Sequence, residues 1–284
     1  MDLFEQLRCR AVGTEKRVIF PEQSDPRVLE AIDLLQELRV CVPVALNEYE
    51  GTTCEVFWRR QDADQLFRAA SLAYFESSRG KVASIAQAED ELRGDSLLLA
   101  AALVRSGYAD TGVAGSIAAT GDVLRACLRG IGLAASSKLL SSCFVIEHPY
   151  RVMTFGDCAV TPEPNSEQLA QIAVDCARTH FLLTDTSPKV AFLSFSTLGS
   201  ACHASIDRIR EAVERVRVLA PKLDVCGELQ VDASLVPEVG AKKAGSSSVA
   251  GYANVLIFPD LNSGNIAYKI AERLGGAKAI GPVL

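Results

Sequence analysis

Side chains that could bind a polar or anionic ligand gather in segment 194–200, directly after the apolar run 189–194. The segment offers hydroxyl groups from Ser196, Thr197 and Ser200, and Gly199 lets the backbone approach a ligand closely. Backbone N–H groups in such a loop can cradle a phosphate. The alternative is a polar turn that caps the next helix.

A second cluster follows the apolar run 255–258, and it combines carboxylate, amide and ammonium groups. Its side chains could hold a polar or anionic ligand at the start of a helix expected over 264–274. The alternative is an Asx-type turn that only caps this helix. The candidate binding residues of this cluster are Asp260, Asn262, Gly264, Asn265 and Lys269.

A glycine-rich segment, 112–122, leads to Arg125 near the start of a helix expected over 122–133. An arginine in that place can hold a phosphate through two parallel hydrogen bonds. It could equally be a surface arginine that pairs with Asp122. None of the three segments has the spacing of a Walker A or GxGxxG motif, so the sequence does not indicate ordinary nucleotide binding.

Cysteine and histidine offer little material for a metal centre or a nucleophilic triad. The nine cysteines include no C-x-x-C spacing, and the three histidines share no motif. Zinc sites, disulfide frameworks and Ser-His-Asp triads are therefore not expected. Most of the cysteines lie among apolar neighbours, and we expect them to be small buried side chains in a reducing cytosol.

The composition indicates a folded cytoplasmic protein without a membrane or nucleic-acid partner. About half of the 284 residues are apolar, which excludes a disordered chain, and the net charge of −6 comes with no basic stripe. The longest apolar run, 97–104, is too short to cross a bilayer. The N-terminal residues are charged and amphipathic and do not resemble a secretory signal.

The elements that must position the candidate residues alternate between strand and helix. Strands are expected at 17–20, 42–46, 112–115, 143–147, 151–155, 189–194 and 255–258. Helices are expected after the Asp25-Pro26 cap and at 62–76, 95–106, 122–133, 166–181, 205–220 and 264–274. This alternation predicts an α/β fold with mainly parallel sheets, in two domains spanning residues 1–136 and 137–284.

Several motifs make the chain resemble the phosphate acetyltransferase family, which is related to the phosphate butyryltransferases. The resemblance is strongest from 189 to 282 and is carried by segments 193–197, 227–232, 249–254, 257–269 and 280–282. Segment 18–27 resembles the opening strand and helix of the family. The resemblance implies two Rossmann-like α/β domains of the isocitrate/isopropylmalate dehydrogenase type, usually in a homodimer, with the active site in the interdomain cleft.

The resemblance also implies a reaction in which acetyl moves reversibly between coenzyme A and inorganic phosphate. Coenzyme A is then a substrate, and neither a tightly bound cofactor nor a metal is expected. Positioning, a base for the thiol and cations for the phosphate would carry the chemistry. Arg125 matches a family arginine that contacts phosphate or substrate, and the segments at 196–200 and 260–265 match cleft-lining loops.

The sequence departs from the family pattern in two places. The family has a second arginine three residues after a tyrosine. In this chain Ser77 takes that position after Tyr74, and Arg79 lies nearby. The family's serine–arginine pair and the aspartate proposed as thiol base lie beyond the position of Leu284, as does the segment that closes the first domain. The catalytic residues are thus unknown, and the activity of this shortened chain stays open.

The alternatives to acetyl transfer are a weakened or inactive relative that binds coenzyme A or acetyl phosphate in a regulatory or assembly role, and a phosphate butyryltransferase.

Overall fold

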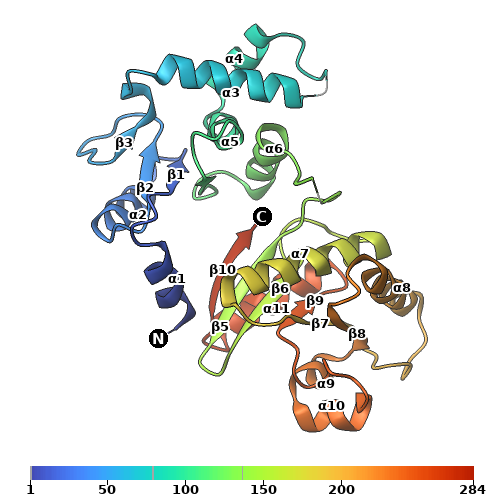
Figure 1. The fold of residues 1–284 in the computed structure, drawn as a ribbon. Coiled ribbons are helices and arrows are strands. Elements are labelled where there is room, and N and C mark those ends of the chain that lie inside the picture. Colours follow the sequence, from blue (N-terminus) through green and yellow to red (C-terminus); the bar gives the residue numbers. More distant parts are fainter. Residues whose placement is uncertain (1, 79, 136) are drawn as a thin grey trace. The chain divides into compact units, whose positions relative to one another are not determined.

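The computed structural model describes residues 2–78, 80–135 and 137–284. The chain divides into two compact units, Leu3–Leu133 and Ala134–Leu284, and each is described by itself. Both combine helices with a sheet (Figure 1), so the expected α/β class is confirmed. None of the described helices is long and apolar enough to cross a membrane.

The first unit contains a four-stranded parallel sheet in the order β3-β2-β1-β4. Its core lies between the sheet and helices α3, α4 and α5, around buried side chains such as Ile19, Phe67 and Leu103. The elements are α1 (Leu3–Ala11), β1 (Arg17–Phe20), α2 (Pro26–Glu37), β2 (Val42–Ala45), β3 (Glu55–Val56), the 3₁₀ helix η1 (Phe57–Arg59), α3 (Ala63–Ser77), α4 (Ile85–Gly94), α5 (Ser96–Arg105), β4 (Thr111–Gly112) and α6 (Thr120–Gly130).

The second unit contains a six-stranded mixed sheet in the order β10-β5-β6-β9-β7-β8. Strands β6, β9, β7 and β8 run parallel, whereas β5 is antiparallel to both of its neighbours. The elements are β5 (Cys143–His148), β6 (Arg151–Gly156), α7 (Ser166–Thr184), β7 (Lys189–Leu193), α8 (Ala204–Leu219), β8 (Asp224–Leu229), α9 (Val231–Leu235), α10 (Pro237–Ala244), β9 (Val255–Ile257), α11 (Leu261–Arg273) and β10 (Lys278–Val283).

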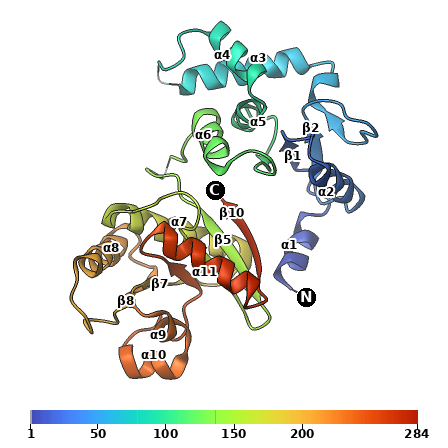
Figure 2. The ribbon, with the colours of Figure 1, turned by 180° about the vertical axis from the view of Figure 1, so that it is seen from behind.

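Helices cover both faces of this second sheet. Successive side chains of a strand point to opposite faces, so Val190 and Phe192 pack under α7 and α8, and Leu193 packs on the other side. Figures 1 and 2 show α7 and α8 on one face and α11 on the other. On the α11 face, the Tyr268 ring stacks on Phe144 with the ring centroids 4.0 Å apart.

The structure corrects three expectations about local structure. The strand expected at 112–115 is only the two-residue β4, and both of its residues are exposed rather than buried. Helix α6 begins at Thr120, so Arg125 lies beyond its first turn. Helix α11 begins at Leu261 rather than at 264, because the Asp260 carboxylate accepts a hydrogen bond from the Ser263 N–H (2.8 Å) and caps the helix there.

All nine cysteines are free thiols, but their burial varies more than their apolar neighbours suggested. Cys143, Cys158, Cys176 and Cys226 are buried in the second unit. Cys9 and Cys202 are exposed, and the other three are half-buried.

Candidate active site

The carboxyl ends of the four parallel strands of the second unit meet at one edge of its sheet. Open α/β sheets bind ligands beyond this edge. The segments that follow β7 and β9 are those at 194–200 and 259–265, and β9 lies directly beside β7. The fold therefore brings two of the three sequence-selected segments together at neighbouring strand ends.

The segment after β7 is a tightly hydrogen-bonded loop. The Ser200 hydroxyl accepts from the Thr197 N–H (3.0 Å), and the Ser196 hydroxyl accepts from the Ala201 N–H (3.1 Å). The Thr197 hydroxyl accepts from the Gln230 N–H (3.0 Å), which joins this loop to the end of β8. Several of the N–H groups that the sequence offered to a phosphate thus have partners within the chain.

Glu228, at the end of β8, is the anchor of this loop. Its carboxylate accepts from the Ser196 hydroxyl (3.0 Å), the Gly199 N–H (2.8 Å) and the Arg210 guanidinium (2.8 and 2.9 Å). The side chain is only 1% exposed. Burial alone would raise the pKa of Glu228, but these donors outweigh it and lower the pKa to about 2. Glu228 is therefore a carboxylate at neutral pH.

The segment after β9 forms the first turns of α11. Asp260 is the N-cap, and Asn262 is exposed near it. The Asn265 amide donates to the Cys158 carbonyl (3.1 Å), which binds the helix to the turn after β6. Lys269 is exposed, and its Nζ lies 5.8 Å from the centroid of the Tyr268 ring.

Gly264 has a packing role at this helix start. A Cβ atom on Gly264 would lie 2.4 Å from the Asp157 carbonyl oxygen. Only glycine lets α11 approach the turn after β6 so closely. The structure thus gives Gly264 a steric reason to be glycine, whether or not it also touches a substrate.

Asp157 organises the turn that α11 packs against. Its buried carboxylate accepts from the Ser142 hydroxyl (2.6 Å) and from the N–H groups of Ala159 (3.0 Å), Val160 (3.2 Å) and Thr161 (2.8 Å). The Thr161 hydroxyl is buried and has no hydrogen-bond partner in the part of the chain that the structure describes. Asp157 therefore fixes the strand end beside which the helix begins.

Arg208 adds a cation at the same edge that the sequence reasoning missed. One of its terminal nitrogens donates to the Pro259 carbonyl (3.1 Å), at the end of β9. Its buried Nε has no partner among residues 2–78, 80–135 and 137–284. The helical spacing of α8 predicted its apolar face but gave no sign of this contact, which depends on how α8 packs on the sheet.

In the first unit, the glycine-rich segment before α6 is also occupied by a carboxylate of the chain. Glu22, which follows β1, accepts hydrogen bonds of 2.6 to 3.0 Å from four successive N–H groups, those of residues 115–118. Burial alone would raise the pKa of Glu22, but these donors lower it below its usual value. The amides of this glycine-rich segment therefore bind a protein carboxylate in this structure.

Arg125 lies on α6 with its side chain 66% exposed, and it pairs with Asp122 at 2.6 Å. This pair is the alternative to phosphate binding that the sequence allowed for Arg125. Because the pair is exposed, the guanidinium is still accessible to an anion. At the position where the family has a second arginine, the Ser77 hydroxyl donates to the Tyr74 carbonyl (2.9 Å). The nearby Arg79 lies outside the described residues.

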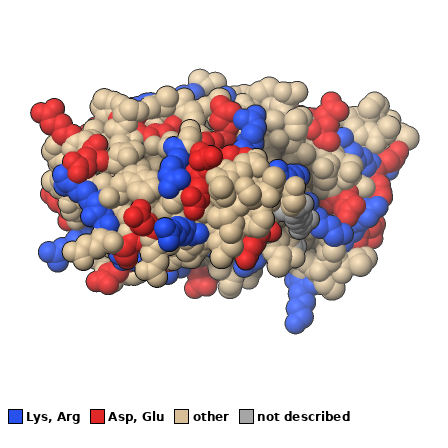
Figure 3. Space-filling view, turned by 90° about the horizontal axis from the view of Figure 1, so that it is seen from above, with Lys and Arg blue, Asp and Glu red and all other residues tan. Residues whose placement is uncertain are grey.

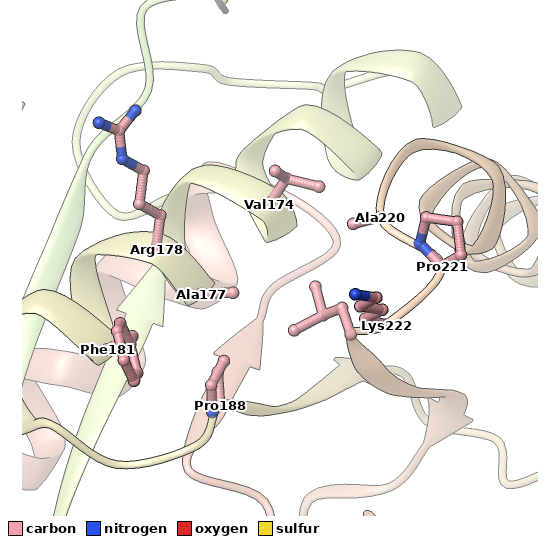
Figure 4. Close-up of a pocket in the computed structure, with 9 residues that line it drawn as sticks. Val174, Ala177, Arg178, Phe181, Pro188, Ala220, Pro221 and Lys222 are labelled. Atoms are coloured by element: carbon pink, nitrogen blue, oxygen red, sulfur yellow. The ribbon is translucent and has the colours of Figure 1, made fainter.

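A groove of about 530 Å³ lies at the opposite end of the second sheet (Figure 4). Pro188 and Leu223 come just before β7 and β8, so the groove lies at the amino ends of these strands. It is lined mainly by apolar side chains of α7 and of the segment after α8. Its position and lining separate it from the polar edge described above.

The described residues show neither a one-sign charged patch on the face in Figure 3 nor a cluster of metal ligands. Basic and acidic side chains are intermixed on the face shown in Figure 3. Among the described residues, no group of three or more His, Cys, Asp or Glu side chains is placed to hold a metal ion.

Comparison with known proteins finds relatives that match along the whole chain. Residues 2–284 match the family model described as phosphate acetyl/butaryl transferase. The chain is 38% identical to the phosphate acetyltransferase of Thermoanaerobacterium thermosaccharolyticum and 35% identical to that of Bacillus subtilis. Each alignment covers 100% of this chain and 90% of the relative.

Solved structures show the same likeness. A phosphotransacetylase from Streptococcus pyogenes superposes with a TM-score of 0.88 at 37% identity, covering 99% of this chain and 88% of the other. A branched-chain phosphotransacylase from Enterococcus faecalis shares the fold, with a TM-score of 0.69 at 20% identity over 93% of this chain and 86% of the other.

Proposed function

Since the chain belongs to the phosphate acetyl/butaryl transferase family, we propose that it is an acyltransferase that moves acetyl reversibly between coenzyme A and inorganic phosphate. The observation that carries this proposal is the likeness over the full length of the chain to relatives named phosphate acetyltransferase. These relatives favour acetyl over butyryl as the transferred group.

The reaction transfers the acyl group of an acyl phosphate to a thiol, and it requires the two substrates to be held next to each other. The thiolate of coenzyme A attacks the acetyl carbonyl, and phosphate leaves with the electron pair of the C–O bond. In the reverse direction a phosphate oxygen attacks the thioester carbonyl and the thiolate leaves. Orientation of the two reactants supplies much of the rate enhancement in such reactions. Cations and hydrogen-bond donors that stabilise the oxyanion supply more.

We propose that the edge at the ends of β7 and β9 binds the substrates. The groups there that can contact a ligand are the exposed amide of Asn262, the exposed ammonium of Lys269 and the guanidinium of the half-buried Arg208. The hydroxyl groups of Ser196, Thr197 and Ser200, the carboxylate of Asp260 and the amide of Asn265 are held by hydrogen bonds within the chain and shape the edge. We assign phosphate binding on the first unit to Arg125, because the resemblance places a phosphate-contacting arginine there.

Three further features of the working protein belong to this proposal. Coenzyme A acts as a substrate that binds and leaves in each turnover rather than as a resident cofactor. The protein works in the cytoplasm, as the sequence leads us to expect. It assembles as a homodimer, as the resemblance implies.

The direct test mixes the purified chain with coenzyme A and acetyl phosphate and follows thioester absorbance. We expect the rate of thioester formation to rise in proportion to protein concentration, and butyryl phosphate to react more slowly than acetyl phosphate. Tight binding of coenzyme A without turnover would contradict the proposal and support a binding protein. A faster reaction with butyryl phosphate would reassign the acyl group.

A further inference from the structure

The geometry around Glu228 points to a role for this residue in the acyl transfer. We infer that Glu228 is a positioning residue, which holds the loop 194–200 in the conformation that receives the substrate. The inference rests on the proposed function, because it concerns the same site. Glu228 received no role from the sequence, since a buried carboxylate cannot be told from a surface one by type alone.

The backbone of the loop requires such an anchor. Leu198 has a φ of 42° and Gly199 a φ of 93°, so two successive residues adopt the left-handed region. This region disfavours a leucine, and such a conformation persists only where the surroundings enforce it. The Leu198 N–H donates to the Glu228 carbonyl (3.0 Å), and the Gly199 N–H donates to the Glu228 side chain (2.8 Å). Glu228 thus holds both residues.

Arg210 of α8 completes the arrangement. Its Nε donates to Oε2 of Glu228 and one terminal nitrogen donates to Oε1, so the planar guanidinium holds both carboxylate oxygens. Oε1 also accepts from Ser196 and Gly199, and it therefore joins the loop to the helix. This carboxylate thus contacts both the loop and α8 from the end of β8, in addition to the main-chain contacts between the loop and β8.

Glu228 acts through the loop and not on the substrate itself. Its carboxylate is 1% exposed and is surrounded by donors from the chain. A misplacement of about 1 Å in groups that orient a substrate can cost on the order of 100-fold in rate. Releasing the loop should therefore impair turnover even though no group that touches the substrate is removed.

The test compares Glu228→Gln with Glu214→Gln. A glutamine at 228 cannot accept hydrogen bonds at both of its terminal atoms, so it cannot satisfy the loop and Arg210 together. Glu214 pairs with Arg217 on the exposed face of the same helix, α8, and its substitution changes the net charge equally. Two readouts are used: kcat and KM for each substrate, and deuterium uptake of the peptide that covers 194–201.

We expect Glu228→Gln to lower kcat/KM by about 10- to 100-fold and to raise KM for at least one substrate. Exchange in the 194–201 peptide should accelerate, while Glu214→Gln leaves both readouts at the wild-type value. Kinetic constants of Glu228→Gln within about twofold of wild type would overturn the inference. So would a loss of activity with unchanged KM and unchanged loop exchange, because that pattern indicates only a loss of folded enzyme.

A second variant covers the case in which Glu228→Gln does not fold. Arg210→Lys keeps the positive charge but removes the bidentate hydrogen bonding to Glu228. Because the Arg210 side chain is 40% exposed, we expect this variant to fold. It should shift both readouts in the same direction, and unchanged readouts would overturn the inference. If the wild-type chain shows no turnover at all, the proposed function fails, and the loop exchange alone decides whether Glu228 holds the loop.

Discussion

Three carboxylates lie at the ends of strands: Glu22 follows β1, Asp157 follows β6, and Glu228 lies near the end of β8. Each accepts several hydrogen bonds from nearby loop residues. Backbone N–H groups in glycine-rich turns bind anions whatever their origin. In two of the three segments selected from the sequence, a carboxylate of the protein is that anion. We therefore expect side chains, more than loop amides, to bind the ligand.

Arg125 provides a test at the residue scale. Because its exposed pair with Asp122 contributes no more than about 1 kcal/mol to stability, Arg125→Ala should leave the free energy of unfolding nearly unchanged. If Arg125 binds phosphate, KM for phosphate and for acetyl phosphate should rise about tenfold or more. Steady-state kinetics and urea unfolding of the same preparation measure both quantities.

The matched control is Arg215→Ala, which removes an arginine that is paired with Glu211 on the surface of α8. It should change neither kinetics nor stability by a comparable amount. Unchanged KM values in Arg125→Ala would remove Arg125 from the site. An equal effect of both substitutions would show that the loss follows from net charge alone.

At the scale of elements, the site depends on where α11 begins and on what it packs against. The sequence predicted the helix but not its start, because the polar residues after Asp260 indicated a turn before the helix, whereas Asp260 is the cap and the helix begins at Leu261. Sequence spacing also gave no sign that Gly264 faces the Asp157 carbonyl. That contact joins residues far apart in the chain, and it exists only once β6 and β9 are paired.

Gly264→Ala tests this packing. Its Cβ would meet the Asp157 carbonyl oxygen at 2.4 Å and Sγ of Cys158 at 3.2 Å, so α11 must shift. We expect a loss of about 1 to 3 kcal/mol in the free energy of unfolding, measured with urea, and reduced turnover because α11 carries Asn265 and Lys269.

Gly94→Ala is the control, since a Cβ at Gly94 meets no atom within 4 Å at the end of α4. It should be neutral or stabilise the protein by up to about 1 kcal/mol. Equal stability of the two variants would refute the packing role of Gly264.

His180 links α7 to β6 and gives this part of the fold a pH dependence. Its ring nitrogens lie 2.9 Å from the Thr154 hydroxyl and 3.0 Å from the Thr186 hydroxyl. Burial lowers the pKa of His180 to about 4, from a usual value of 6.5. Because the folded protein resists protonation of this ring, stability is highest above pH 6.5 and declines as the pH falls from about 6.5 to about 4, by up to about 1.4 kcal/mol per pH unit.

His180→Gln isolates this contribution, because the acidic groups that titrate in the same range are common to both proteins. The wild type should be more stable at pH 7, and its advantage should shrink as the pH approaches 4. Urea unfolding at several pH values measures the difference. A constant difference between the two proteins would mean that His180 does not titrate in the expected way.

At the scale of the whole molecule, the α/β class and most of the regular elements were predictable, because hydrophobic periodicity and helix caps are local signals. The strand predicted at 112–115 was wrong in length and burial, since Val113 and Ala114 suggested a buried strand, whereas both lie exposed after the two-residue β4. Strands β8 and β10 were not predicted, although both complete the second sheet.

The site was predictable only in part, and for a related reason. Segments 194–200 and 259–265 follow buried strands, and the parallel order of β7 and β9 places them side by side. Arg208, Arg210 and Glu228 were missed because their roles arise from contacts between elements and not from a motif. The family was recognisable from the sequence and is confirmed by the comparisons, whereas the binding roles of the individual residues stay predictions.

The proposed function requires that inorganic phosphate accepts the acetyl group. The decisive experiment incubates the purified chain with acetyl-CoA while inorganic phosphate is varied, and measures free thiol and acetyl phosphate together. We expect thiol release that saturates with phosphate and is matched by an equal amount of acetyl phosphate. Thiol release without phosphate, or no release at any phosphate concentration, would contradict the claim.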